Sequence, residues 1–258
     1  MEHDPGTDTV EYEGDDLEAL STMHRYREWI VNHFEPYLTG EAVEIGAGIG
    51  NIAHHIAPHV RSLLLVEPSS RLVETMEIKF SENDNIAITR WDFDGFVNDT
   101  TGEVFDCVIL VNILEHIEDD ENALKECRRI LRRDGKLLIL VPALPFLFSD
   151  LDSKHGHFRR YARGDLMRKV RDANFDIVYS SYFDMLGIVP WYLLNTLGGA
   201  VKFDPRLMSV YDKIFVPITR WIESRISPPI GKNLIVVGYC GARSMDDAAT
   251  RHDRRTDG

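Results

Sequence analysis

Residues 44–51 read EIGAGIGN, and this short stretch decides the fold class. Its three glycines alternate directly after the apolar residues AVEI (42–45) and before NIAHHIA (51–57), which suits a helix. Glycines between a strand and a helix permit a tight turn and let backbone N–H groups approach a ligand closely. A dinucleotide-binding fingerprint has the spacing GxGxxG, whereas the spacing here is GxGxG. Glu44 precedes the first glycine by two residues, and its charge favours a cationic ligand over a pyrophosphate.

Apolar strands and helical segments alternate on both sides of this glycine loop. The sequence predicts strands at 42–45, 62–67, 85–90, 104–112, 136–141, 175–183 and 233–242, and helices at 17–38, 51–57, 69–80 and 119–132. Near-continuous apolar strands separated by helices indicate a parallel sheet covered on both faces. Because crossovers are right-handed, we predict an α/β, doubly wound sheet with its ligand crevice at the carboxyl ends of the strands.

Acids follow three successive strands of the predicted sheet. Glu67 ends the second strand, where a carboxylate can accept both hydroxyls of a ribose. Asp92 follows the third strand and is suited to accept from an adenine amino group, with Phe93 packing on the ring. Together with Glu44, these positions suit a ligand with a ribose, an amino base and a positive charge.

These features resemble the class I S-adenosylmethionine-dependent methyltransferases, as do VNILEHIEDD (111–120) and DGKLLILVPA (134–143). The resemblance spans roughly residues 40–145. It implies a seven-stranded sheet of order 3-2-1-4-5-7-6 with an antiparallel last strand, and conversion of S-adenosyl-L-methionine to S-adenosyl-L-homocysteine. In such a site the glycine loop cradles the amino-acid part of the cofactor, and the acids after strands two and three bind ribose and adenine. The implied cofactor-binding residues are Glu44, Gly46, Ala47, Gly48, Glu67, Pro68, Asp92, Phe93 and Asn112.

Two histidines are candidates for a general base. Methyl transfer from a sulfonium is an in-line displacement, for which the protein supplies orientation and, where needed, a base. His157 follows strand five, and His116 follows strand four. For His116 a base, a contact to the cofactor pocket and a simple helix-opening position remain open. We predict no metal site, because HExxH is absent and the adjacent His54 and His55 point in different directions on a helix.

Positive charge is concentrated in KHGHFRRYAR (154–163), although the chain has a net charge of −13. Arginine forks bind carboxylate and phosphate groups bidentately. We therefore predict that Arg159, Arg160 and Tyr161 contact an anionic acceptor, while the later cations in RGDLMRKVRDANF (163–175) form a solvated helix face. Asp152 followed by GHFRRY is similar to a branch of uncharacterised and lipid- or glycan-pathway class I methyltransferases.

An insertion of about fifty residues separates the last two predicted strands, which is long for such a connection. MLGIVPWYLLNTLGGAV (185–201) has no charge, but it holds a proline and is at the lower length limit for crossing a bilayer, so we predict no span. Residues 207–226 are amphipathic at helical spacing. Three interpretations stay open: a helical lid over 185–230, a homodimer face, and a peripheral membrane contact through 185–226.

Composition restricts the class of protein and the compartment. A net charge of −13 and an isoelectric point of about 5.2 disfavour a nucleic-acid partner. Cys107, Cys127 and Cys240 form no CxxC pair, which fits a reducing compartment. Residues 1–20 hold eight acids and neither Lys nor Arg, unlike a signal peptide. We therefore expect a cytoplasmic protein.

The predicted organisation is one methyltransferase domain over residues 17–242, between disordered tails at 1–16 and 243–258. Its predicted function is methyl transfer to a small-molecule or lipid-linked acceptor with an anionic group, with oxygen favoured as the acceptor atom. An N- or C-methyltransferase and a non-catalytic cofactor-binding protein remain alternatives. A nicotinamide-dependent dehydrogenase also places an acid after strand two, but the GxGxG spacing and Asp92 count against it.

Overall fold

The computed structural model describes residues 21–199 and 204–241, and its strands form a seven-stranded sheet of order β3-β2-β1-β4-β5-β7-β6. Strand β7 runs antiparallel to both β5 and β6, and the other pairs are parallel. This arrangement confirms the predicted fold class and strand order. The strands are β1 (Glu41–Ile45), β2 (Ser62–Val66), β3 (Ile86–Thr89), β4 (Phe105–Val111), β5 (Leu131–Pro142), β6 (Asp176–Phe183) and β7 (Asn233–Tyr239).

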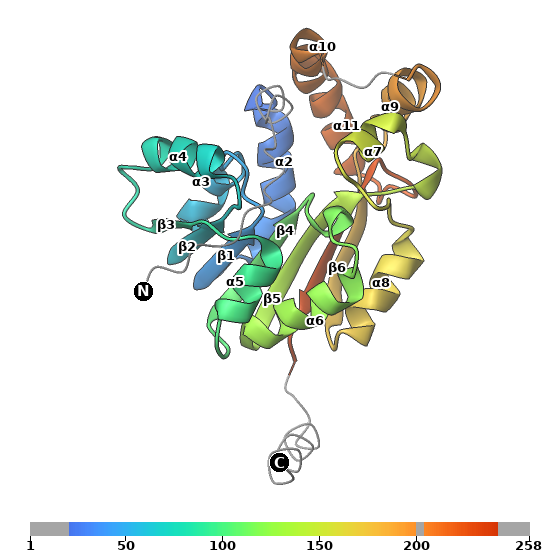
Figure 1. Ribbon diagram of the computed structural model, residues 1–258. Helices are drawn as coiled ribbons and strands as arrows, with labels where there is room; N and C mark the ends of the chain where they lie inside the picture. Colours follow the sequence, from blue (N-terminus) through green and yellow to red (C-terminus); the bar gives the residue numbers. More distant parts are fainter. Residues whose placement is uncertain (1–20, 200–203, 242–258) are drawn as a thin grey trace.

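Helices cover both faces of the sheet (Figure 1). Helices α5, α6 and α8 pack on one face, and α2, α3 and α4 pack on the other. The α-helices before the insertion are α2 (His24–Phe34), α3 (Ala53–Ile56), α4 (Ser70–Lys79), α5 (Phe93–Asp99), α6 (Asp120–Ile130), α7 (Asp150–Lys154) and α8 (Arg163–Asp172). Short 3-10 turns are η1 (Glu35–Tyr37), η2 (Ala57–His59), η3 (Leu114–His116) and η4 (Pro145–Leu147).

Strand β4 shows why the middle of a central strand is apolar at successive positions. Val108 and Leu110 are buried in the core beneath α5 and α6, whereas Cys107 and Ile109 are buried in the core beneath α2 and α3. Successive side chains of a strand point to opposite faces. A strand that is covered on both faces therefore buries all of them, and polar alternation disappears.

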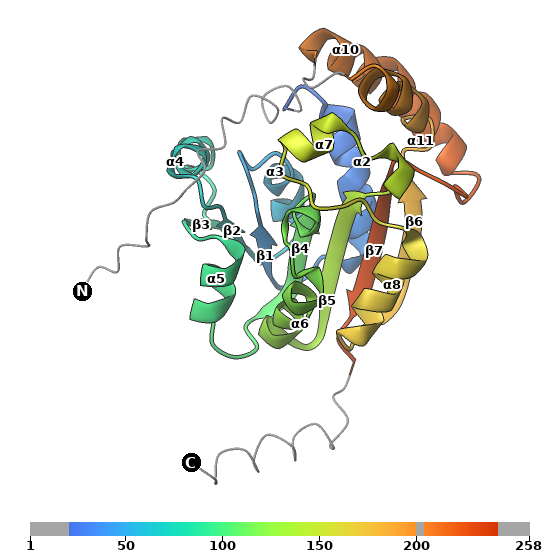
Figure 2. The ribbon, with the colours of Figure 1, turned by 45° about the vertical axis from the view of Figure 1, so that its right-hand side comes forward.

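The insertion between β6 and β7 lies above the carboxyl ends of the parallel strands (Figures 1 and 2). It contains α9 (Ile188–Trp191), the π-helical segment η5 (Tyr192–Leu197), α10 (Pro205–Val210), the π-helical segment η6 (Tyr211–Phe215) and α11 (Val216–Glu223). Its two ends meet at a neck, where the Lys232 N–H donates to the Asp184 carbonyl at 3.1 Å. The Lys232 Nζ and an Asp184 carboxylate oxygen lie 3.0 Å apart at the same place.

Several predicted elements differ in their bounds. The predicted helix at 17–38 is α2 followed by η1, because Pro36 lies in a 3-10 turn rather than in the helix. The predicted helix at 51–57 begins two residues later, as α3 followed by η2, and Pro58 lies in that 3-10 turn. Residues 1–20 and 242–258, which include both predicted tails, lie outside the described residues. Within 21–199 and 204–241, no helix combines the length and hydrophobicity needed to cross a membrane.

Candidate active site

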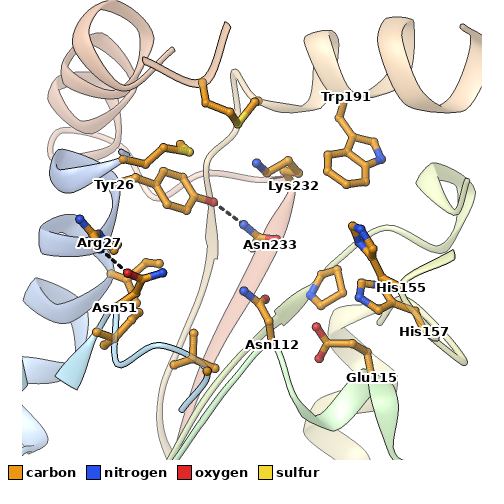
Figure 3. A pocket seen from close by; sticks show the side chains of 18 of the residues that line it. Tyr26, Arg27, Asn51, Asn112, Glu115, His155, His157, Trp191, Lys232 and Asn233 are labelled. Atoms are coloured by element: carbon orange, nitrogen blue, oxygen red, sulfur yellow. Dashed lines mark hydrogen bonds between the residues drawn. The ribbon is translucent and has the colours of Figure 1, made fainter. Parts of the chain in front are cut away.

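A cavity of about 480 Å³ opens at the carboxyl ends of β1, β4 and β5 beneath the insertion (Figure 3). Its volume is typical of small-molecule sites. The glycine loop and the segments that follow β4 and β5 form its base, and α9, η5 and α10 contribute to its roof. The predicted site residues that line it are Glu44, Gly46, Ala47, Gly48, Asn112, His116, His157 and Arg160.

The glycine loop turns sharply at the end of β1. Gly46 has φ +75°, and a Cβ atom placed on it would overlap the Ile113 side chain. The N–H groups of Gly46 and Ala47 both donate to the Val66 carbonyl, at 2.9 and 3.1 Å, which holds the turn against β2. Only glycine fits both the left-handed backbone and the close approach at position 46.

Glu44 lies beneath this loop with its side chain buried. Its Oε2 has no hydrogen-bond partner among residues 21–199 and 204–241. Burial raises the pKa of Glu44 to about 8, with Glu67 contributing in the same direction and Lys79 opposing. A buried carboxyl group that lines a cavity and lacks a partner is suited to a cationic ligand, such as the α-ammonium of an amino acid.

Other predicted cofactor residues lie outside the lining of this cavity. The buried carboxylate of Glu67 accepts from the Gly48 N–H at 2.9 Å and from the Ser69 N–H at 3.1 Å, so it ties the end of β2 to the glycine loop. Asp92 is exposed and caps α5 by accepting from the Gly95 N–H at 2.7 Å. Pro68 is also exposed, and the partly buried Phe93 packs against the core. The structure thus brings the predicted amino-acid end of the cofactor site into the cavity and leaves the predicted adenosine end beyond it.

The two candidate histidines lie next to one another. The ring centroids of His116 and His157 are 4.6 Å apart, and the rings are perpendicular. Burial, with a smaller contribution from the neighbouring histidines, lowers the pKa of His116 to about 4, so this ring is neutral at pH 7. The Nδ1 of His157 lies 2.9 Å from an Asp152 carboxylate oxygen, which leaves its Nε2 available to the cavity. Glu115 lines the same part of the cavity and is wholly buried.

Arg160 lies in the cavity wall, but Asp152 holds it. Its Nε and Nη2 are each 2.9 Å from Asp152 Oδ1, and its guanidinium lies 4.4 Å from the centroid of the Trp191 ring. Asp152 is fully buried and also accepts from Ser149. Much of the charge of Arg160 therefore neutralises an acid inside the protein.

The structure does not bring Arg159 and Tyr161 into the cavity. Arg159 forms an ion pair with Asp120 at 3.0 Å, and the buried Tyr161 hydroxyl donates to the same carboxylate at 2.8 Å. Lys169 also contacts Asp120, at 2.7 Å. Much of the positive charge after β5 thus pairs with two buried acids, Asp120 and Asp152, and Arg159 and Tyr161 contact Asp120 outside the lining of the cavity.

Sequence reasoning missed the wall of the cavity that the insertion and α2 provide. Lys232 lies over the rings of Tyr26 and Trp191, at 5.2 and 5.7 Å from their centroids. The Asn233 side-chain amide donates to the Tyr26 hydroxyl at 2.6 Å. No local motif marks these residues, because only the folding of the insertion over the sheet brings them together. The missed lining residues labelled in Figure 3 are Tyr26, Arg27, Asn51, Glu115, His155, Trp191, Lys232 and Asn233.

Comparisons with known proteins identify a domain within this fold. The family model described as a methyltransferase domain matches residues 43–137. No curated protein matches the chain.

Solved structures share the fold at low sequence identity. A chain from the complex between the Haloferax volcanii Trm112 methyltransferase activator and a methyltransferase is 16% identical, with a TM-score of 0.63, over 92% of this chain and 100% of that one. A SAM-dependent methyltransferase from Thermotoga maritima is 20% identical, with a TM-score of 0.58, over 89% and 97% of the two chains. The N-methyltransferase NodS from Bradyrhizobium japonicum, solved with S-adenosyl-L-homocysteine, is 14% identical, with a TM-score of 0.57, over 89% and 94%.

The residues of the cavity fit the cofactor of this family. The turn at Gly46 leaves no room for a side chain, so a ligand can approach the backbone closely. The unpartnered Oε2 of Glu44 can accept a hydrogen bond from a donor or contact a cation. By the family model, residues 43–137 form a methyltransferase domain within this seven-stranded sheet, and the cofactor of the domain is S-adenosylmethionine.

Proposed function

We propose that this enzyme methylates an oxygen atom of a small-molecule or lipid-linked acceptor that carries an anionic group. The observation that carries the proposal is the continuity of one cavity. It joins the glycine loop and Glu44 at one end to His116 and His157 at the other, beneath the apolar residues of the insertion.

The cofactor end of the cavity is assigned to residues of β1 and the loop after it. Bound S-adenosylmethionine supplies a methyl group that its sulfonium makes electrophilic. We assign Gly46, Ala47 and Gly48 to its amino-acid part, with Glu44 facing the ammonium. Glu67 and Asp92 remain our assignments for the ribose and the adenine.

The histidines supply the base that an acceptor hydroxyl needs. A hydroxyl is a weak nucleophile until its proton is removed. Asp152 orients His157 through Nδ1, so Nε2 is placed to accept that proton. In the transfer the acceptor oxygen forms a bond to the methyl carbon, the carbon–sulfur bond breaks with its electron pair remaining on sulfur, and the proton moves to the imidazole.

Two cations in the cavity wall support an anionic group on the acceptor. Arg160 and Lys232 both lie over the ring of Trp191, at 4.4 and 5.7 Å from its centroid. Each is paired with one acid, Asp152 for Arg160 and Asp184 for Lys232. Each retains donor capacity beyond that pair, so an anion in the cavity would gain charge-assisted hydrogen bonds.

The insertion supports an acceptor with an apolar part. Leu194 and Leu207 line the cavity, yet about half of each side chain is exposed. A surface with this many exposed apolar residues marks an interaction site, and we assign it to a membrane surface or the chain of a lipid-linked acceptor. The exposed apolar residues of the insertion and its exit are Val189, Tyr192, Leu193, Leu194, Leu197, Leu207, Val210, Ile214, Phe215, Ile218, Trp221, Ile226 and Ile230.

A turnover assay that follows S-adenosyl-L-homocysteine tests the chemistry. Hydroxyl acceptors that pair an anionic group with a lipid chain should react faster than the same head groups without the chain. His157→Asn should lower kcat by about 10²–10⁴-fold, the usual contribution of a general base. Turnover only with amine acceptors would overturn the choice of oxygen.

Flotation with anionic and neutral vesicles tests the apolar surface. The double variant Ile214→Ser, Ile218→Ser should lose vesicle binding, whereas Ile78→Ser, which removes an exposed apolar residue from α4, should keep it. Unchanged flotation of the double variant would overturn the membrane assignment. A concentration-dependent dimer that the same double variant dissociates would assign this surface to a second copy of the chain.

A further inference from the structure

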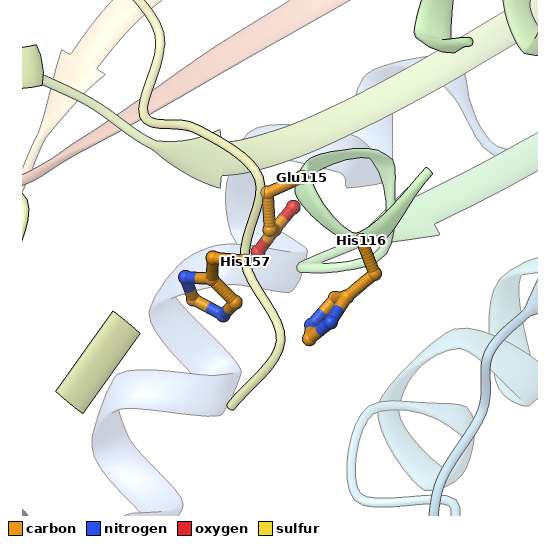
Figure 4. A group of neighbouring side chains, drawn as sticks. All are labelled: Glu115, His116 and His157. Atoms are coloured by element: carbon orange, nitrogen blue, oxygen red, sulfur yellow. The ribbon is translucent and has the colours of Figure 1, made fainter. Parts of the chain in front are cut away.

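Glu115, His116 and His157 gather three potential metal ligands at the base of the cavity (Figure 4). Each offers one ligand atom, and these atoms lie within 4.8 Å of one another. Glu115 and His116 come from η3 after β4, and His157 comes from the segment after α7. The fold therefore brings together ligands from two separate segments of the chain.

The burial of Glu115 without a hydrogen-bond partner is a second, independent indication of a ligand. Its side chain is wholly buried, and neither carboxylate oxygen has a hydrogen-bond partner among residues 21–199 and 204–241. Such a group is costly to bury alone. The nearby Arg160 is held by Asp152 and does not bond to Glu115. A cation between Glu115 and the two imidazoles would supply the missing partner.

His157 has the hydrogen bond to a carboxylate that is typical of metal-binding histidines, and its partner is Asp152. A ligating histidine commonly gives its other ring nitrogen to a carboxylate, which fixes the orientation of the ring. His157 does this through Nδ1, which lies 2.9 Å from Asp152. Ser149 holds Asp152 in turn, through its N–H and its hydroxyl, each at 2.9 Å. Nε2 of His157 is thereby presented to the cluster.

We propose that Glu115, His116 and His157 bind a divalent transition-metal ion such as Zn²⁺, Mn²⁺ or Fe²⁺. Two imidazoles and one carboxylate form the ligand set of catalytic zinc sites and of non-haem iron sites, both of which keep open positions. Ligands at about 2.1 Å from a tetrahedral ion lie about 3.4 Å apart. The ligand atoms, now within 4.8 Å of one another, would therefore approach by up to about 1.4 Å around the ion, which rotation of the side chains can provide.

Because all three ligands line the cavity, an ion held by them would have its open positions on the cavity side. An acceptor oxygen that coordinates there would have its hydroxyl pKa lowered by the ion, which would then replace His157 in promoting loss of the proton. This role rests on the proposed function, whereas binding of the ion does not.

Titration of the metal-stripped full chain with Zn²⁺ and Mn²⁺ tests the site directly. Calorimetry should show one site per chain, and the melting temperature should rise with metal concentration. Glu115→Gln, His116→Ala and His157→Ala should each weaken binding at least tenfold, since loss even of an outer partner costs about 10–100-fold. Glu115→Gln keeps the shape of the side chain and replaces an unpartnered buried carboxyl group with an amide, so it should remain folded.

His155→Ala is the matched control. It removes an imidazole from the same cavity wall but from outside the cluster, and it should bind metal as the native chain does. Equal binding by the native chain and all three ligand variants would reveal an adventitious surface site and overturn the inference. An equal loss in His155→Ala would overturn the assignment of these three ligands.

Titration of the same proteins with S-adenosyl-L-homocysteine separates the two proposals. If the native chain binds S-adenosyl-L-homocysteine but no metal ion, the metal inference alone is refuted. A metal site in a chain that binds no cofactor product would refute the proposed function and leave the metal inference standing.

Discussion

Replacing Glu44 by glutamine tests whether the acid beneath the glycine loop is buried without a full counter-charge. Burial raises the pKa of Glu44 from an ordinary value of 4.5 to about 8. When the folded pKa lies above the unfolded one, the stabilisation is complete below the unfolded pKa and is lost as the pH rises toward the folded pKa. For Glu44 that window extends from about pH 4.5 to about pH 8.

The magnitude follows from the width of this window. Each pH unit in which only the unfolded chain releases the proton lowers the free energy of unfolding by about 1.36 kcal/mol. Between about pH 5 and about pH 8, Glu44 should therefore lower the free energy of unfolding by about 4 kcal/mol. Glu44→Gln has no proton to release, so its stability relative to the native chain should rise by the same amount over that interval.

Urea denaturation at a series of pH values between these limits measures the difference. Glu77→Gln removes the same charge from the exposed side of α4 and serves as the control, because it should follow the native curve. Native and Glu44→Gln curves that stay parallel across the interval would refute the burial argument.

Glu44→Gln also tests whether Glu44 contacts the ammonium group of the cofactor. A charge-assisted hydrogen bond is worth about 1.5–3 kcal/mol, so Glu44→Gln should weaken binding of S-adenosyl-L-homocysteine about tenfold or more near pH 8. Unchanged affinity would show that Glu44 does not face the ammonium of the cofactor product.

Three further substitutions have expected outcomes. Gly46→Ala places a methyl group against Ile113 on a left-handed backbone, so calorimetry should show S-adenosyl-L-homocysteine affinity at least tenfold lower. Asp152→Asn leaves Arg160 buried without its counter-charge, and urea denaturation should show a loss of about 3–5 kcal/mol. Tyr161→Phe removes a buried hydroxyl and should lower stability by about 1–3 kcal/mol while kcat/KM stays native, whereas a large fall in kcat/KM would restore Tyr161 to the acceptor site.

The sheet was predictable because its signal is local. An apolar run such as that in β4 follows from burial on both faces, and the GxGxG spacing after β1 marks a left-handed backbone that glycine adopts without steric cost. The antiparallel last strand came from the family resemblance. Glu44 could also be singled out from the sequence, because it is an acid within an otherwise apolar strand end.

The acceptor side was harder to predict because its contacts are distant in sequence. Whether an arginine in KHGHFRRYAR faces solvent, a ligand or a buried acid depends on how the chain folds back, and here Arg160 meets Asp152. In LEHIEDD, Glu115 is buried and Glu118 is exposed, although both are acids near a helix start. Glu115 is buried because it lies within the turn η3, whereas Glu118 follows that turn. No local sequence pattern indicates which of the two acids is buried.

The neck at Asp184 and Lys232 closes the insertion at its base. Because the chain leaves β6 and returns to β7 at one closed point, we expect changes in the parts of the insertion outside the shared core to leave the pairing of β6 with β7 intact. The wall that faces the acceptor can therefore diverge while the wall that faces the cofactor stays constant. New acceptor specificities can arise by exchange of this one segment, in evolution as in engineered chimaeras.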